Sequence, residues 1–177
     1  MKKIFLAIFL LVGLQAASQT QLKWMSFEEA VAANEQNPKK IFIDVYTDWC
    51  GWCKVMDKQT FTDSAVIAAM NKYFYPVKFN AQSRTKIKFS GQDFGFNARN
   101  NAHDLAVALL RGQMSYPSTV YMDGKNRVIT AVPGFQKPEN IMPILIYMGE
   151  GLYETQPWEE FQKEYQARKT PKTIETL

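Results

Sequence analysis

The sequence contains few cysteines and histidines, the residues that crosslink small proteins and bind metals, and this excludes some classes of protein. It contains two cysteines and one histidine in 177 residues. Two cysteines are too few for a disulfide-stapled mini-protein, and a closed zinc site needs four ligands. The composition of 46% apolar, 14% aromatic and 21% charged residues is that of a globular protein rather than a disordered chain. At this length, one domain can bury a hydrophobic core of its own.

The charge balance gives no sign of a nucleic-acid partner. The formal net charge is +4, and Lys2 and Lys3 in the extreme N-terminus account for two of these charges. The rest of the chain is nearly balanced, whereas nucleic-acid-binding domains are strongly basic. We therefore expect no nucleic acid among its partners.

Residues 1–18 have the pattern of a secretory signal. Two lysines precede an apolar run over residues 4–14, and small residues follow it. The run is too short for a membrane span, which needs about 20 apolar residues. Ala16 and Ser18 fit a small-x-small cleavage pattern, which puts the start of the mature chain near Gln19. We therefore predict a periplasmic or secreted protein with no stable membrane insertion after cleavage; an uncleaved N-terminal anchor is the alternative.

Apolar periodicity and turn residues predict an α/β domain over residues 19–170, followed by a flexible tail at 171–177. The expected elements, in chain order, are a helix from Ser26, a strand over 41–46, helices over 50–59 and 63–72, a strand over 75–79, a hairpin of 87–89 and 93–96, a helix over 102–110, strands over 118–122 and 127–132, and helices over 138–148 and 158–167. This order gives a central mixed sheet flanked by helices. Residues 81–100 would carry a small β-hairpin insertion, and residues 149–168 a C-terminal helical extension. Pro143 lies inside a predicted helix, so that helix either starts later or bends.

The two cysteines are spaced C-x-x-C directly after the buried strand, at the start of a helix. Free backbone N–H groups and the positive end of the helix dipole stabilise a thiolate at this position. We expect Cys50 to be the attacking sulfur, exposed at the helix tip, and Cys53, one turn later, to resolve the mixed disulfide. The pattern therefore predicts redox chemistry.

Three other interpretations of the pair are weaker. As a structural staple, so small a loop removes only about 2 kcal/mol of unfolded-state entropy. A zinc site lacks ligands, because His103, which we expect on the surface at a helix start, lies about 50 residues after Cys53. Two inert core thiols do not suit a turn marked by Gly51 between Trp49 and Trp52. No metal is expected.

The segment IFIDVYTDWCGWCK resembles the active-site segment of the thioredoxin superfamily, in which a buried strand carrying an Asp runs into W-C-G-x-C-K. The likeness extends over nearly the whole mature chain, through YPVKFN, the Tyr116-Pro117-Ser118-Thr119 loop and Gly134. The CGWCK sequence, the M-x-x-x-T-F-x-D stretch after it and the GEGLY…W-E-E-F tail resemble a secreted subgroup related to periplasmic thiol:disulfide interchange proteins. The resemblance implies a thioredoxin fold.

The resemblance also implies two groups that handle a proton beneath the cysteines. Asp44 matches the family's buried carboxylate. Burial raises the pKa of such a carboxylate, so it can take the proton that Cys53 must lose. Lys78 matches the lysine that lies against this carboxylate. The alternatives are an Asp44 satisfied by backbone N–H groups and a Lys78 that is an ordinary solvated charge.

A substrate-binding surface is implied as well. Pro117 matches the family's cis-proline, and a cis bond would turn the backbone of Tyr116 outward, where a substrate segment could pair with it as an added strand. Trp49 and Trp52 would add an apolar rim around the sulfur, although core packing is the alternative for any one aromatic residue.

The residues around the pair predict the direction of electron flow. Oxidants of this superfamily commonly hold a His just before the second Cys, where this chain has Trp52. Asp44 and Asp48 add negative charge, which disfavours the Cys50 thiolate and makes the couple more reducing. We therefore predict an extracytoplasmic reductase of protein disulfides. A disulfide isomerase with holdase character and a non-enzymatic interaction module are the alternatives.

An extracytoplasmic reductase needs electrons from elsewhere. The chain has no flavin or nicotinamide motif, so we expect no cofactor. A membrane-embedded thiol donor is implied instead.

Overall fold

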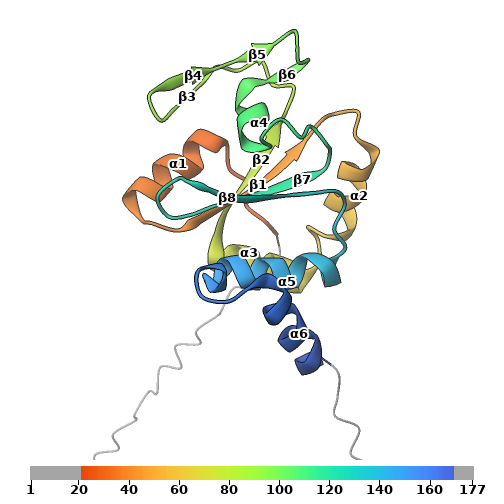
Figure 1. Ribbon diagram of the computed structural model, residues 1–177. Helices are drawn as coiled ribbons and strands as arrows, with labels where there is room; N and C mark the ends of the chain where they lie inside the picture. Colours follow the sequence, from red (N-terminus) through yellow and green to blue (C-terminus); the bar gives the residue numbers. More distant parts are fainter. Residues whose placement is uncertain (1–20, 170–177) are drawn as a thin grey trace, which may run out of the picture.

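The computed structural model describes residues 21–169. The predicted signal peptide at 1–18 and the tail at 171–177 lie outside these residues. The core is a four-stranded sheet in the order β2-β1-β7-β8 (Figure 1). Its strands are β1 (Lys40–Tyr46), β2 (Phe74–Asn80), β7 (Ser118–Met122) and β8 (Val128–Pro133). β1 runs parallel to β2 and antiparallel to β7, and β8 is antiparallel to β7, so the sheet is mixed as predicted.

Helices cover both faces of this sheet (Figure 1). Ile43 and Val45 of β1 pack in one apolar cluster with α1 (Phe27–Gln36) and α4 (Asp104–Leu109). Phe42 belongs to the opposite cluster, with α2 (Gly51–Gln59), α3 (Ser64–Tyr73) and α5 (Pro138–Gly149). Because side chains alternate along a strand, Asp44 points to the same face as Phe42. The mostly apolar sequence of β1 is thus explained by burial on both sides.

Local signals in the sequence fix where the helices begin. Ser26 and Glu29 form the capping box at the start of α1, and Asp63 caps α3 by accepting hydrogen bonds from two backbone N–H groups. α5 begins at Pro138 and continues through Pro143, so the later start, one of the two alternatives for this helix, is wrong. Pro143 lies in the interior of this twelve-residue helix, where its missing N–H removes one intrahelical hydrogen bond.

The segment between β2 and α4 projects from one end of the molecule (Figure 1). It contains the predicted hairpin, formed by β3 (Ile87–Phe89) and β4 (Gln92–Phe94), and a second pair, β5 (Phe96–Asn97) and β6 (Ala102–His103), which the sequence did not indicate. His103 is fully buried rather than on the surface: its Nδ1 accepts the Leu105 N–H at 3.1 Å and its Nε2 lies 2.9 Å from the Thr85 carbonyl oxygen. The prediction that His103 lies at a helix start is confirmed, because His103 is the N-cap of α4. Its ring, however, points into the protein interior.

The C-terminal extension packs under α5 (Figure 1). It consists of a short 3-10 helix, η1 (Leu152–Glu154), and α6 (Trp158–Lys169). The buried Phe161 of α6 contacts the ring of Tyr147 at a centroid distance of 5.1 Å. Over residues 21–169, none of the helices has the length and apolar character that crossing a bilayer requires.

Candidate active site

The C-x-x-C pair lies where β1 leads into α2, and its two sulfurs are bonded to each other. Cys50 is the N-cap of α2, and its Sγ accepts the backbone N–H of Cys53 at 3.1 Å. The backbone N–H of Cys50 in turn donates to the Thr47 carbonyl oxygen at 3.1 Å. The bond between the sulfurs contradicts the interpretation as two inert thiols. Within residues 21–169, no group of three or more His, Cys, Asp or Glu side chains is placed to hold a metal ion.

The exposure of Cys50 differs from the prediction. Only 4% of the residue is exposed, because its sulfur is turned into the first helical turn toward the Cys53 N–H. The flanking Trp49 and Trp52 are 66% and 62% exposed, and they are the large apolar residues presented to solvent in the described chain. The accessible surface at the pair is therefore aromatic.

The loop that leads into β7, the strand next to β1, meets these tryptophans. The peptide bond between Tyr116 and Pro117 is cis, as the resemblance implied. The Pro117 carbonyl oxygen accepts the Gly134 N–H at 2.8 Å, and Gly134 has the positive φ of 90° that glycine tolerates. These three residues, with Trp52 and Phe135, line a hollow of about 200 Å³.

Aromatic contacts fix the walls of this hollow. The ring of Trp52 lies 5.3 Å from that of Phe135, and the ring of Trp49 meets Tyr116 edge-on at 5.8 Å. Trp49 also donates its indole N–H to Gln82 Oε1 at 3.0 Å. The predicted substrate-binding residues are therefore brought together at one surface, although the roles assigned to them remain predictions.

A buried ion pair lies on the α2 side of the sheet. Asp44 is 1% exposed; its Oδ2 accepts from Lys78 Nζ at 2.6 Å, and its Oδ1 has no hydrogen-bond partner. The alternatives of a carboxylate satisfied by backbone N–H groups and of a solvated Lys78 are therefore wrong. Burial raises the pKa of Asp44 from 3.8 to about 6, against the opposing effect of Lys78.

Sequence reasoning missed a third member of this cluster. Lys78 also forms an ion pair with Asp57 of α2, whose side chain is 43% exposed. Burial lowers the pKa of Lys78, but the two carboxylates outweigh it and the pKa is raised overall. The signal was present in the spacing, because Asp57 follows Cys53 by four residues and so lies on the same helical face.

The buried carboxylate gives a testable pH dependence. A folded-state pKa raised from 3.8 to about 6 means that folding favours the protonated acid, so its contribution is present at low pH and is lost as the pH rises through 6. Between about pH 3 and pH 7 we expect the unfolding free energy of the oxidised protein to fall by about 3 kcal/mol relative to that of Asp44→Asn. Chemical denaturation without reductant measures this difference. Parallel profiles for the two proteins would contradict it.

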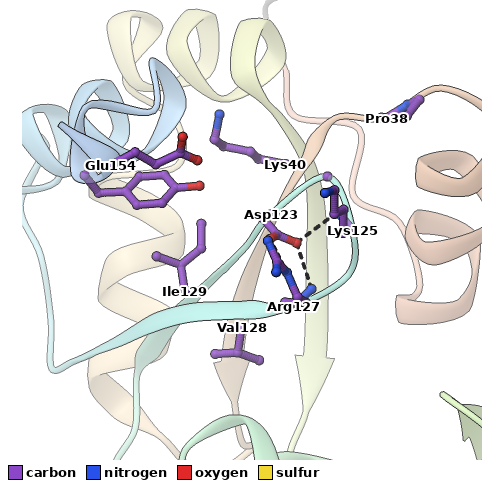
Figure 2. A pocket seen from close by; sticks show the side chains of 10 residues that line it. Pro38, Lys40, Asp123, Lys125, Arg127, Val128, Ile129 and Glu154 are labelled. Carbon is purple, nitrogen blue, oxygen red and sulfur yellow. Dashed lines mark hydrogen bonds and ion pairs between the residues drawn. The ribbon is translucent and has the colours of Figure 1, made fainter.

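A hollow of about 900 Å³ lies at the other end of the sheet (Figure 2). Lys40, which lines it, begins β1, whereas the cysteines follow the end of that strand. Two of its charged side chains already have partners: Arg127 forms an ion pair with Asp123, and Lys40 Nζ donates a hydrogen bond to the Gly149 carbonyl oxygen. This hollow is not part of the redox site.

The fold and the disulfide-bonded pair define a thioredoxin-fold protein with a C-x-x-C centre. The model of the Thioredox_DsbH family, described as "Protein of unknown function, DUF255", matches residues 12–152. The chain belongs to this family. Family, fold and cysteine pair together support thiol–disulfide oxidoreductase activity in general.

Curated relatives and solved structures agree with this assignment. The thiol:disulfide interchange protein DsbD of Ralstonia nicotianae is 27% identical over 119 residues, 67% of this chain and 17% of that protein. DsbD of Pseudoalteromonas atlantica is 34% identical over 64 residues, 36% of this chain and 11% of that protein. The chain thus spans less than a fifth of the length of these relatives.

Two solved structures show the likeness in fold. A DsbH oxidoreductase has a TM-score of 0.52 at 18% identity, covering 73% of this chain and 85% of that one. A thioredoxin-fold protein from Helicobacter pylori has a TM-score of 0.53 at 16% identity, covering 79% and 94%. At these identities the comparison establishes the fold.

Proposed function

We propose that this protein is an extracytoplasmic thiol–disulfide oxidoreductase that reduces disulfide bonds in protein clients. The observation that carries the proposal is the disulfide-bonded pair at the start of α2, with a buried carboxylate of raised pKa on the same side of the sheet. A dithiol at a helix start supplies the nucleophile, and a neighbouring carboxylate supplies a place for a proton.

The reaction runs in two exchanges. In the first, the Cys50 thiolate attacks a client disulfide; a bond from Cys50 to the client forms, and the client's other sulfur leaves as a thiolate that takes a proton from water. In the second, Cys53 gives its proton to ionised Asp44 and attacks Cys50 Sγ. The Cys50–Cys53 bond forms and the client's first sulfur leaves as a thiolate, which takes a proton from water, and Asp44 afterwards returns its proton to water. Two electrons have passed to the client, which now holds two thiols.

The surroundings of the pair support the reducing direction. The backbone N–H of Cys53 donates to the Cys50 sulfur, but the side chain before Cys53 is Trp52, which brings no positive charge. Asp48 lies in the loop that leads to Cys50. A thiolate with little stabilisation corresponds to a more reducing couple.

The extracytoplasmic location and the electron source belong to the proposal. The segment at residues 1–18 supports export, and curated relatives are named thiol:disulfide interchange proteins. A membrane-embedded protein dithiol would restore the reduced pair by exchange, becoming a disulfide itself.

A redox titration of the purified protein tests the direction. We expect the Cys50–Cys53 couple to equilibrate at a potential below that of protein disulfide isomerase, about −180 mV. Reduction of insulin disulfides by the reduced protein should follow. A potential above this value would overturn the reductase assignment.

The exposed aromatic surface favours one second candidate, a disulfide isomerase that holds unfolded clients. Trp49 and Trp52 are presented beside the pair, where they could bind apolar client segments. The two candidates differ in outcome, because an isomerase restores activity to scrambled ribonuclease without net loss of disulfides. A reductase leaves that client with free thiols.

A further inference from the structure

Three polar side chains form a row across the sheet at the level of Asp44. Lys78 on β2 is paired in register with Asp44 on one side, and Thr119 on β7 is paired with it on the other. Residues paired in this way point to the same face. Lys78 already serves one carboxylate oxygen, Oδ2. The other oxygen, Oδ1, has no hydrogen-bond partner.

The polar atoms on the Thr119 side of this row lack partners. Asp44 Oδ1, Thr119 Oγ1 and Tyr121 Oη are buried and have no hydrogen-bond partner within normal geometry, although the Thr119 and Tyr121 side chains are close enough to interact. Thr119 and Tyr121 are both 0% exposed, and their two-residue spacing on β7 places them on one face. Burying such groups unpaired is costly, so buried polar atoms are nearly always satisfied.

We propose that Thr119 is a positioning residue that acts through Asp44: its hydroxyl donates to Oδ1 of the ionised carboxylate and accepts the hydroxyl proton of Tyr121. Directly opposed residues of antiparallel strands have Cβ atoms about 4.5–5.5 Å apart, within reach of a side-chain hydrogen bond. A threonine hydroxyl has one donor and two acceptor sites, so two hydrogen bonds satisfy all three atoms. Burial raises the pKa of Tyr121, which keeps its hydroxyl a donor.

This role rests on the proposed function, because Asp44 must be ionised before it can accept the proton of Cys53. A hydrogen bond to the charged form favours ionisation. The other charged or titratable groups that act on Asp44 are Lys78 on β2 and Asp57 on α2, and Tyr46 lies on β1 itself. Thr119 is thus the neutral donor opposite the ammonium group.

The test replaces Thr119 by valine, which has the same shape but no hydroxyl, and by serine, which keeps the hydroxyl. Carboxyl carbon NMR of the oxidised protein follows the titration of Asp44. We expect Thr119→Val to raise the Asp44 midpoint by about one pH unit, whereas Thr119→Ser stays near the wild type. Thr47→Val is the matched control, since it removes another buried, unpartnered hydroxyl from outside this row. It should leave the midpoint unchanged.

Three results would overturn the proposal: an unchanged midpoint in Thr119→Val, a midpoint in Thr119→Ser as high as in the valine variant, or an equal shift in Thr47→Val. A purely structural role would lower stability without moving the titration. The NMR experiment needs no client, so it reports on Thr119 even if the protein fails to reduce disulfides. That failure would instead be seen in the wild type, as a lack of insulin reduction.

In the reducing direction, Thr119→Val should slow the release of a client from the mixed disulfide with Cys50 about fivefold near pH 6, because about five times less Asp44 is ionised there. The rate should recover about one pH unit higher, where Asp44 is ionised again. Rapid-mixing measurements across this pH range give the profile. Identical profiles for Thr119→Val and wild type would refute the proposed link to the reaction.

Discussion

Cys50→Ser is expected to lower the rate of client-disulfide reduction more than about a thousandfold, because a serine hydroxyl cannot replace a thiolate in exchange. The loss should not come from unfolding. Losing a disulfide that closes so small a loop costs about 2 kcal/mol on the chain-entropy model, and the aromatic and apolar packing around the sheet is untouched. Insulin reduction with the chemically reduced protein measures the rate.

Cys53→Ala is the matched control, since it also removes the disulfide but leaves the attacking sulfur. It should hold clients as mixed disulfides on Cys50, which non-reducing electrophoresis and mass spectrometry detect and identify. Cys50→Ser should hold none. If Cys50→Ser kept the biological role of the protein, the chain would be a non-enzymatic interaction module. Reduction of client disulfides by Cys50→Ser at the wild-type rate would contradict the proposed attack by the Cys50 thiolate.

Lys78→Met is expected to destabilise the protein increasingly as the pH rises. The ammonium group holds the pKa of Asp44 down against burial, so without it the carboxyl stays protonated to a higher pH. Above its pKa of about 6, the carboxyl of Asp44 ionises in the folded wild type, whereas it stays protonated in the folded variant. The variant therefore loses stability relative to the wild type as the pH rises above about 6. At about pH 8 we expect the variant to lose about 2 to 3 kcal/mol through Asp44 alone.

The double variant Lys78→Met with Asp44→Asn isolates this effect. It lacks the buried acid, so its deficit relative to Asp44→Asn should not grow between about pH 6 and pH 8. Chemical denaturation of the four oxidised proteins at both pH values provides the measurement. A deficit of Lys78→Met that is constant with pH would show that the ion pair does not control the protonation of Asp44.

Local patterns predicted the redox pair and most of the sheet. The strand over 118–122, the capping box at Ser26 and the helix start at Asp63 follow from short-range signals, and the structure has all three. The two-residue strands β5 and β6 were not predicted, because so short a pairing leaves no periodicity to detect. The inward turn of His103 was missed for a related reason: its partner Thr85 is distant in sequence.

The sequence alone determined the C-x-x-C centre, its place between a strand and a helix, and the presence of an acid and a lysine on neighbouring strands. Only the tertiary structure decided which groups meet. Lys78 is shared between Asp44 and Asp57, Cys50 is turned inward while the two tryptophans are exposed, and Thr119 is paired in register with Asp44. The physical reason is that spacing along a chain fixes side-chain direction within one element. Strand register and burial fix which distant groups meet, and therefore which proton each of them holds.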